Sequence, residues 1–343
     1  MPANAGMIFN TLLQIAAFDA IPTDDIYEAI TGGIDFGEAI NANFDTLGFE
    51  STFIIVNLGS LGLVIMVVYP MLYVLFYLMS FFSCFKFMRK WRIKLGKILF
   101  WGATLRLFIE SFMIAFLAGI INLKNLNFDT DASWEFANTV LSIVFLVLYS
   151  LFPIISTQYL RRHFNLLTNK RFNEKYGELY AGLNITRINV VHHVRLDYFR
   201  KVVICISVVF YQEGLWAQIL ICIMMSVFLV ISAGTLNPSL SRADMYMERF
   251  NETRLIIIVY HIMCFTDFIP DSETRFNVGF SCIAIIMGGL LINSIKLISE
   301  PIYLLRRRIK LYFYKKAEKK QRKMKRVDTK NFNARVLIKY QTE

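Results

Sequence analysis

Long apolar runs separated by charged connections are the feature that most restricts what this chain can fold into. Several of these runs exceed the roughly 18 residues that an apolar helix needs to cross a bilayer core about 30 Å thick. Only 18% of the residues are charged, whereas a soluble domain has about 25%. Backbone groups in lipid must find hydrogen-bond partners within their own segment, so runs of this length must be helical. The sequence therefore predicts an all-α transmembrane bundle.

Seven apolar segments of the chain are candidate membrane spans. In chain order they are residues 53–82, 99–122, 138–160, 200–214, 216–236, 255–270 and 277–299. Pro70 lies inside the first span and is expected to kink it. Gly279, Gly288 and Gly289 lie in the last span, where small residues allow neighbouring helices to approach closely. We therefore expect a bundle of about seven helices.

The distribution of positive charge predicts how this bundle is oriented. No Lys or Arg precedes Lys86, although the same stretch holds eight carboxylates. Of the 37 Lys and Arg residues, 33 lie in alternate connections and the tail, whereas the opposite connections hold only Lys124 and Arg275. Cytoplasmic connections carry the excess of Lys and Arg. The N-terminus is therefore expected outside the cytoplasm and the tail inside it. Seven spans keep the alternation of charge, and five or eight would break it.

Three regions follow from these boundaries. They are a short acidic extracytoplasmic segment 1–52, a seven-span transmembrane domain 53–300 with a cytoplasmic loop 161–201, and a polybasic cytoplasmic tail 301–343. The first region shows neither a signal-peptide pattern nor an Arg-rich presequence. We therefore expect a multi-pass integral protein of the plasma membrane or an endomembrane rather than a mitochondrial membrane.

Two charged residues lie one helical turn apart inside the second span. Arg106 and Glu110 are ionisable groups at membrane depth, where such groups are costly and face a protein interior or a water-filled cavity. They could line an ion or lipid-headgroup pathway, or they could form a structural pair that fixes helix packing. Since Arg before Glu is the less favourable order for a pair four residues apart, either residue could instead bond to another helix.

Four further polar residues lie in the last two spans. His261 and Asp267 are six residues apart and so lie on nearly opposite faces of the sixth span, which argues against a metal pair or a proton relay. Asp267 is expected at the extracytoplasmic interface, with a cation site as the alternative. Asn293 could hydrogen-bond across helices, and Lys296 is close enough to the cytoplasmic surface to extend its ammonium group there.

The tail holds the densest positive charge in the chain. Between Arg306 and Arg326 there are twelve Lys and Arg residues against one acid, Glu318. Such a cluster beside a membrane attracts anionic lipid by about 1 kcal/mol per basic residue. The expected headgroup ligands are Arg306, Arg307, Arg308, Lys310, Lys315 and Lys316. A regulatory lipid site, a calmodulin-type site and an ordinary positive-inside stop signal all stay open for this segment.

Sequence signatures of catalysis are absent. The chain has no nucleotide-binding loop, catalytic serine elbow, zinc-ligand helix or paired catalytic carboxylates. We therefore expect no enzymatic activity, no cofactor and no bound metal. Tethering of the basic tail to a membrane argues against nucleic-acid binding. The expected partners are membrane lipids, anionic at the tail, and either other membrane subunits or further copies of the chain.

Several stretches resemble the membrane region of the TRP-like polytopic proteins of ciliates, which are similar to the fungal TRP-like, flavin-carrier-type family. In order they are FDTLGFESTFIIVNLGSLGL (44–63), LFWGATLRLFIESFMIAFLAGIINL (99–123), FNEKYGELYAGLN (172–184), RFNETRLIIIVYHIMCFTDFIPD (249–271) and RFNVGFSCIAIIMGGLLIN (275–293). Together they cover roughly residues 44–305. The resemblance implies a channel- or transporter-like membrane protein. It carries over Arg106, Glu110, Asn251, Glu252 and Asn293 as family positions.

Two functional hypotheses follow. The first is a TRP-like channel or transporter, with a water-accessible path lined by Arg106, Glu110, Asn293 or Lys296 at an oligomer axis. The second is a non-conducting membrane subunit that scaffolds partners or binds lipid in a larger complex. The connector 268–276 favours the second, because it is too short for a pore helix and a filter of backbone carbonyls. Conduction would then have to run between other helices.

Overall fold

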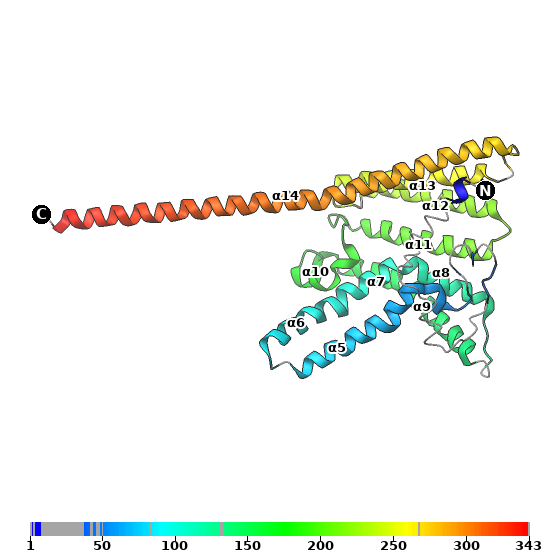
Figure 1. Cartoon of the computed structure of the whole chain (residues 1–343), viewed down its shortest axis with the longest axis horizontal. Coiled ribbons are helices and arrows are strands. Elements are labelled where there is room, and N and C mark those ends of the chain that lie inside the picture. Colours follow the sequence, from blue (N-terminus) through cyan, green and yellow to red (C-terminus); the bar gives the residue numbers. More distant parts are fainter. Residues whose placement is uncertain are drawn as a thin grey trace. The chain divides into compact units, whose positions relative to one another are not determined.

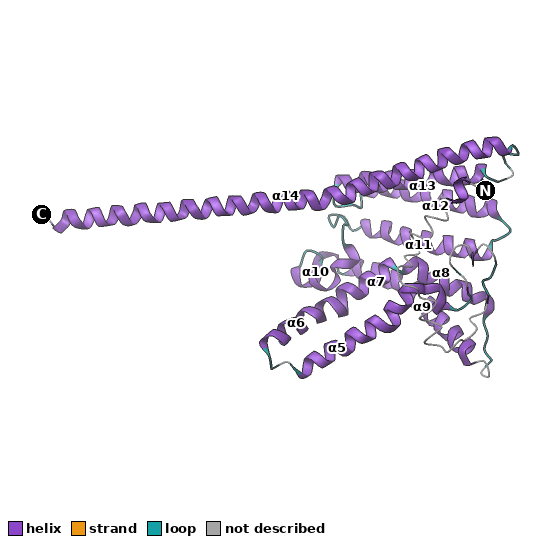
Figure 2. Cartoon of the chain, viewed as in Figure 1, coloured by secondary structure: helices purple, strands orange, loops and turns teal. Residues whose placement is uncertain are grey.

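The computed structural model describes residues 2, 4–7, 38–41, 44–45, 49, 51–82, 84–129, 133–266 and 268–341 of the chain. Within these residues every named element is a helix, and the one extended pairing is an isolated antiparallel bridge between Leu183 and Ser239 (Figure 2). The prediction of an all-helical fold is confirmed. The chain divides into two compact units, residues 1–285 and 286–343.

The first unit is built from helices in and between the predicted spans, and residues 86–97 and 170–176 are helical although they lie in predicted connections (Figure 1). Their bounds are α4 Ile54–Leu63, α5 Tyr69–Phe81, α6 Lys86–Lys97, α7 Thr104–Glu110, α8 Phe112–Asn122, α9 Ser133–Arg162, α10 Lys170–Tyr176, α11 Val190–Phe210, α12 Leu215–Leu236 and α13 Arg242–Cys264. Wider π-helical turns, η1 (Val64–Val68) and η2 (Ile98–Ala103), precede α5 and α7. Short 3₁₀ turns are η3 (Leu123–Asn125), η4 (Phe164–Leu166) and η5 (Gly177–Tyr180). The last helix, α14 (Ser272–Gln341), begins in the first unit and supplies the helix of the second.

The main core of the first unit is aromatic and lies where α8 packs against α4, α9 and α11. Phe112 of α8 is fully buried, and its ring meets Tyr198 of α11 edge-on at 4.9 Å. The Ser111 hydroxyl shares a 2.6 Å hydrogen bond with the hydroxyl of Tyr149 on α9. Buried tyrosine hydroxyls need such a partner, because an unpaired polar group inside an apolar core is costly.

Both of the first two predicted spans are interrupted in the structure. In the first, Gly59 has a φ of 49°, and the wide turn η1 ends just before Pro70, which lies in the first turn of α5. In the second, α7 and α8 are bent by 59° at Ser111. The Ser111 hydroxyl bonds the carbonyl of Leu107 one turn back, a contact that bends helices. Pro70 therefore has irregular backbone beside it, as expected, and Ser111 is a break that was not predicted.

Three helical stretches among the described residues are long and apolar enough to cross a membrane: Trp134–Arg162, Leu215–Leu236 and Ser272–Tyr314. A fourth is the bent pair Lys86–Glu110 with Phe112–Asn122. These three to four helices are compatible with an integral membrane protein. Shorter apolar helices are α4 and α5, and the first halves of α11 and α13 carry charged residues. Seven crossings and the direction of the termini stay predictions.

Gly119 tests the packing of α8 against α9. A Cβ atom at this position would lie 2.8 Å from Cγ of Leu146 on α9, which is closer than carbon atoms pack. Gly119→Ala should therefore destabilise the fold by about 1–3 kcal/mol through overpacking. The readout is a lower midpoint of thermal unfolding in detergent.

Gly234→Ala in α12 is the matched control, because no heavy atom lies within 4 Å of a Cβ there. Alanine should leave the midpoint unchanged or raise it, since it is the better helix former. Equal midpoints for the two variants would contradict the close packing of α8 on α9.

Candidate functional site

Charged residues at helical spacing mark the first halves of α11 and α13. His193 and Asp197 lie one turn apart on α11, as do Glu248 and Glu252 on α13. Residues three or four apart share one helix face, so each helix presents a charged stripe. Both helices pack against α12, one of the apolar candidate spans. The two stripes meet beside α12. We call the bonded side chains of His193, Asp197, Arg200, Glu248 and Glu252, with the residues that they contact, the α11–α13 network.

His193 joins all three helices of this network. Its Nε2 lies 2.5 Å from Oε1 of Glu248 on α13, and its Nδ1 lies 2.9 Å from the hydroxyl of Ser232 on α12. The Ser239 hydroxyl donates to the other oxygen of Glu248 at 2.7 Å. The His193 side chain is only 9% exposed. Its two ring nitrogens are therefore both bonded to protein partners on the neighbouring helices α12 and α13.

Arg200 is the second centre of the network, one and a half to two turns further along α11. Its Nη1 donates to Glu252 at 2.6 Å, and its Nη2 donates to Asp197 at 2.8 Å. Lys201 bonds the other oxygen of Asp197 at 2.9 Å. Arg200 and Glu252 are 14% and 16% exposed. Two cations thus face two carboxylates, and the local charge is compensated.

Arg249 closes the network at the end of α12. Its Nη2 donates to the side chain of Asn237 at 2.9 Å and to the carbonyl of Ala233 at 3.2 Å. Asn237 has the left-handed φ of 47° that ends a helix. The last carbonyls of a helix have no partner within it, so Arg249 satisfies a group that would otherwise be unpaired. These bonds hold the hairpin of α12 and α13, which lie side by side in Figure 1.

The network is a candidate functional site because its ionisable side chains are buried together at the end of α12. Glu248 accepts from Ser239 in the connection after α12, and Arg249 donates to Ala233 and Asn237 where the helix ends. Ionisable residues beside an apolar span are rare, and pair with one another where they occur. No group of three metal-ligating side chains is found among the residues that the structure describes. The available chemistry is proton exchange and the rearrangement of ion pairs.

The pathway residues predicted from the sequence make separate, local contacts. Arg106 Nε bonds Glu110 Oε1 at 2.7 Å within α7, and the two side chains are 65% and 63% exposed. His261 of α13 bonds the carbonyl of Ile257 at 2.8 Å and the hydroxyl of Ser281 on α14 at 3.0 Å. Asp267 lies outside the described residues. Arg106 and Glu110 bond each other in the structure, whereas a bond from either to another helix was the alternative left open by the sequence.

Two predicted pathway residues and the predicted lipid ligands belong to the second unit. Asn293 donates to the carbonyl of Gly289 in its own helix at 2.9 Å, and Lys296 is half-buried. The tail residues with described side chains are all exposed on α14: Arg306, Arg307, Arg308 and Lys310. The side chains of Lys315 and Lys316 lie outside the described set. Exposure of the tail arginines is compatible with lipid contact and with the plainer stop signal.

The sequence did not predict the α11–α13 network as a cluster, although the resemblance carried over one of its members, Glu252. Residues 161–201 and 237–254 are charged and were assigned to cytoplasmic connections, although α11 begins at Val190 and α13 at Arg242. The available signal was the four-residue spacing of His193 with Asp197 and of Glu248 with Glu252. That spacing predicts that the charged residues of each helix lie on one face. Two such faces are expected to pack together, because buried charges pair with one another.

Comparison with known proteins adds no relative. No protein-family model matches the chain, and searches of curated proteins and of solved structures give no significant match.

Glu252→Gln tests whether the Arg200–Glu252 pair holds the helices together. Loss of one partner of a buried pair leaves the other charge uncompensated, which costs about 3 kcal/mol at the lower end of the usual range. The lower end applies because Asp197 still accepts from Arg200. The measurement is the thermal midpoint in detergent.

Glu174→Gln is the matched control, because Glu174 and its partner Lys97 are 44% and 60% exposed. Exposed pairs contribute about 0–1 kcal/mol, so its midpoint should stay near that of the wild type. The double variant Arg200→Gln/Glu252→Gln should be less destabilised than the sum of its single changes. Strict additivity would show that the two side chains do not interact.

Proposed function

We propose that the chain is a polytopic integral membrane protein of the channel or transporter class and that the α11–α13 network is its functional polar element. The observation that carries the proposal is the burial of His193–Glu248 and Arg200–Glu252 beside the apolar helix α12. Ionisable groups that pair with one another beside an apolar span are candidates for a functional site. The TRP-like resemblance of the sequence supports the same class.

The proposed topology has seven crossings, with the N-terminus outside and the basic tail in the cytoplasm. Each of the seven predicted segments is largely helical, the first two with breaks, and the excess of Lys and Arg on one side supports this direction. Large apolar side chains are exposed along several of these helices, among them Leu148 on α9, Leu220 on α12 and Leu291 on α14. Lipid tails would cover such side chains in a membrane.

The network suits ion movement because its charges have more than one possible partner. Asp197 already accepts from both Arg200 and Lys201, so it stays paired if Arg200 turns toward Glu252 alone. His193 can pass a proton to Glu248 while Ser232 holds its other nitrogen. Rearrangement therefore exchanges one ion pair for another and leaves no charge uncompensated.

Removal of the carboxylate of Glu248 or of the imidazole of His193 should lower ion flux. We expect Glu248→Gln and His193→Gln each to reduce cation or proton flux into proteoliposomes by at least about tenfold, since each removes one proton-exchanging group of the His193–Glu248 pair. The variants can differ in stability from the wild type. Flux is therefore compared only for variants whose thermal midpoint equals that of the wild type, at the same amount of reconstituted protein per vesicle.

Glu178→Gln is the silent control, because Glu178 is an exposed residue of η5 outside the network. Flux through wild-type vesicles no greater than through empty ones would refute the channel or transporter class. A change caused by Glu110→Gln but not by Glu248→Gln would instead assign the path to the Arg106–Glu110 face.

A second candidate function is a membrane subunit that serves a larger assembly, and the exposure of Arg106 and Glu110 favours it. This ion pair lies on α7, within the bent candidate span, and nearly two thirds of each side chain is exposed. Ionisable groups that face lipid are costly, so a polar protein surface is the cover that suits them best. A second copy of the chain or another membrane subunit would supply it.

Replacing this pair with apolar residues should weaken such an assembly. Arg106→Leu/Glu110→Leu removes both charges at once and leaves neither uncompensated. We expect a smaller complex by native mass spectrometry after extraction in mild detergent. Met113→Leu, a neutral change at an exposed position on α8, should leave the mass of the complex unaltered. A wild-type protein that is already monomeric would reject this second candidate.

A further inference from the structure

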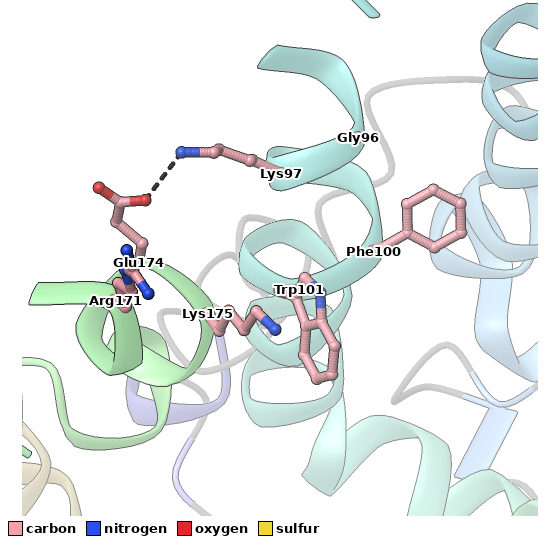
Figure 3. A pocket seen from close by; sticks show the side chains of 7 residues that line it. All are labelled: Gly96, Lys97, Phe100, Trp101, Arg171, Glu174 and Lys175. Atoms are coloured by element: carbon pink, nitrogen blue, oxygen red, sulfur yellow. Dashed lines mark hydrogen bonds and ion pairs between the residues drawn. The ribbon is translucent and has the colours of Figure 1, made fainter. Parts of the chain in front are cut away.

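A cavity of about 320 Å³ lies where the end of α6 and the turn η2 meet α10 (Figure 3). Its polar lining consists of Lys97, Arg171, Lys175 and Glu174, and its apolar lining includes Phe100 and Trp101. The volume lies at the lower end of the range of about 300–1,000 Å³ for small-molecule sites. None of these residues takes part in the α11–α13 network or in the tail cluster.

One wall of the cavity is cationic. Arg171 and Lys175 lie one turn apart on α10, and Lys97 at the end of α6 bonds Glu174 at 2.7 Å. In Figure 3 the Arg171, Glu174 and Lys175 side chains come from the same helix. Glu174 is joined to Lys97, and Lys175 extends toward Trp101. Three cations therefore face one carboxylate, and the lining has a net charge of about +2 (three positive groups and one negative).

The other wall is apolar and aromatic. Phe100 lies against Phe76 of α5 at 5.1 Å and is 39% exposed. The Trp101 ring meets Tyr176 at 4.9 Å, and the ammonium group of Lys175 lies 5.5 Å from its centre. An arrangement of cations on one side and aromatic carbons on the other suits a ligand with a charged head and an apolar body.

The position of the cavity along the chain points to the surface of a membrane. All six charged residues of α6 are basic, whereas η2 begins a mainly apolar stretch that continues through α8 and holds only the Arg106–Glu110 pair. Lys97 and Ile98 thus mark the border between a charged and an apolar helix. In a spanning helix this border lies at the headgroup level, where tryptophan is enriched. Trp101 lies one turn beyond it.

The α10 wall is held in place before any ligand binds. The Tyr180 hydroxyl donates to the carbonyl of Leu167 at 3.0 Å and lies 3.1 Å from the side-chain oxygen of Asn173 in α10. The Asn169 side chain accepts from the backbone of Arg171 at 3.0 Å, which caps the helix at the residue that faces the cavity. A binding wall that is already ordered loses less entropy when it binds.

We propose that this cavity binds the phosphomonoester headgroup of an anionic phospholipid, with Arg171, Lys175 and Lys97 as its phosphate ligands and Phe100 and Trp101 against its glycerol and acyl carbons. A phosphomonoester carries about −1.5 to −2 charges at neutral pH, which matches the lining. Arginine binds two phosphate oxygens at once, and lysine acts as a point charge. The inference rests on the membrane location in the proposed function but not on ion flux.

Among the described residues that line the cavity, Glu174 is the one acidic side chain, and its negative charge disfavours binding of an anionic headgroup. Its substitution is therefore expected to strengthen lipid binding, whereas loss of a basic residue weakens it. The hydrogen bond and charge of Lys97 lower the pKa of the Glu174 carboxyl below its usual value, so the group stays ionised at neutral pH. Its negative charge repels phosphate and keeps Lys97 engaged. Glu174→Gln should therefore free Lys97 and strengthen lipid binding several-fold.

The test measures binding of dioctanoyl phosphatidic acid to the full chain in neutral detergent, by native mass spectrometry over a range of lipid concentrations. We expect Arg171→Gln/Lys175→Gln to weaken the tightest binding step at least tenfold, since each charge-assisted phosphate contact is lost. The charge-matched control is Arg89→Gln/Lys90→Gln, two exposed residues of α6 that do not line the cavity. It should change the affinity less than twofold.

Inorganic phosphate and dioctanoyl phosphatidylcholine distinguish the sources of the ligand chemistry. The lipid proposal requires phosphatidic acid to bind much more tightly than either compound. Phosphate that competes as well as the lipid would assign the cavity to a free anion and overturn the proposal. Equal weakening by both double variants would show a general charge effect, which also overturns it. This assay measures lipid binding and not ion flux. A negative result would therefore reject the lipid site without bearing on the transport proposal, which the flux experiment tests.

Discussion

The buried pairing of Arg200 on α11 with Glu252 on α13 is the interaction on which the arrangement of the last part of the first unit depends. An unpaired charge at this depth would cost several kcal/mol, so neither helix can slide or rotate without the other. The helix α12 is held in the same frame through Ser232, which bonds His193, and through the carbonyls that accept from Arg249. Three helices thus behave as one body.

The helix α11 links this network to the aromatic core. Its residues Tyr198, Cys205 and Val209 are buried in the core formed with α4, α8 and α9, whereas His193 and Arg200 face α12 and α13. Tyr198 and Asp197 are adjacent in sequence, so the ring on Phe112 and the carboxylate on Arg200 are fixed by the same turn. A change on one face of α11 must therefore be felt on the other, because a close-packed interior transmits displacement.

Helical class was predictable from the length of the apolar runs, because that length leaves the backbone no alternative in lipid. The helices α6 and α10 and the charged first halves of α11 and α13 lie outside those runs and were not predicted. The network was not predictable from hydropathy, since its charged turns lower the mean value and resemble a connection. The break at Ser111 depends on a side-chain bond to the carbonyl of Leu107 and on Tyr149, a contact from a different helix. The Arg106–Glu110 pair was found from its spacing, but its exposure depends on which neighbours α7 has. The spacing of residue types along the chain therefore predicts the apolar helices. Which helix faces pack together depends on contacts between residues far apart in the sequence.

The π-helical turn η2 sets how the two ends of its helix are rotated about their common axis. A wide turn of this kind holds one residue more than an α-helical turn and is frequent at functional sites. One residue corresponds to a rotation of about 100° in a regular helix. Within η2, Phe100 reaches α5 while its neighbour Trp101 reaches α10. A chain shortened by one residue here would turn the whole basic stripe of α6 by about a quarter of a circle relative to α7. Insertions and deletions in Ile98–Ala103 would therefore rotate α6 about its axis relative to α7. A substitution in α6 or α7 would change only the contacts of the replaced side chain.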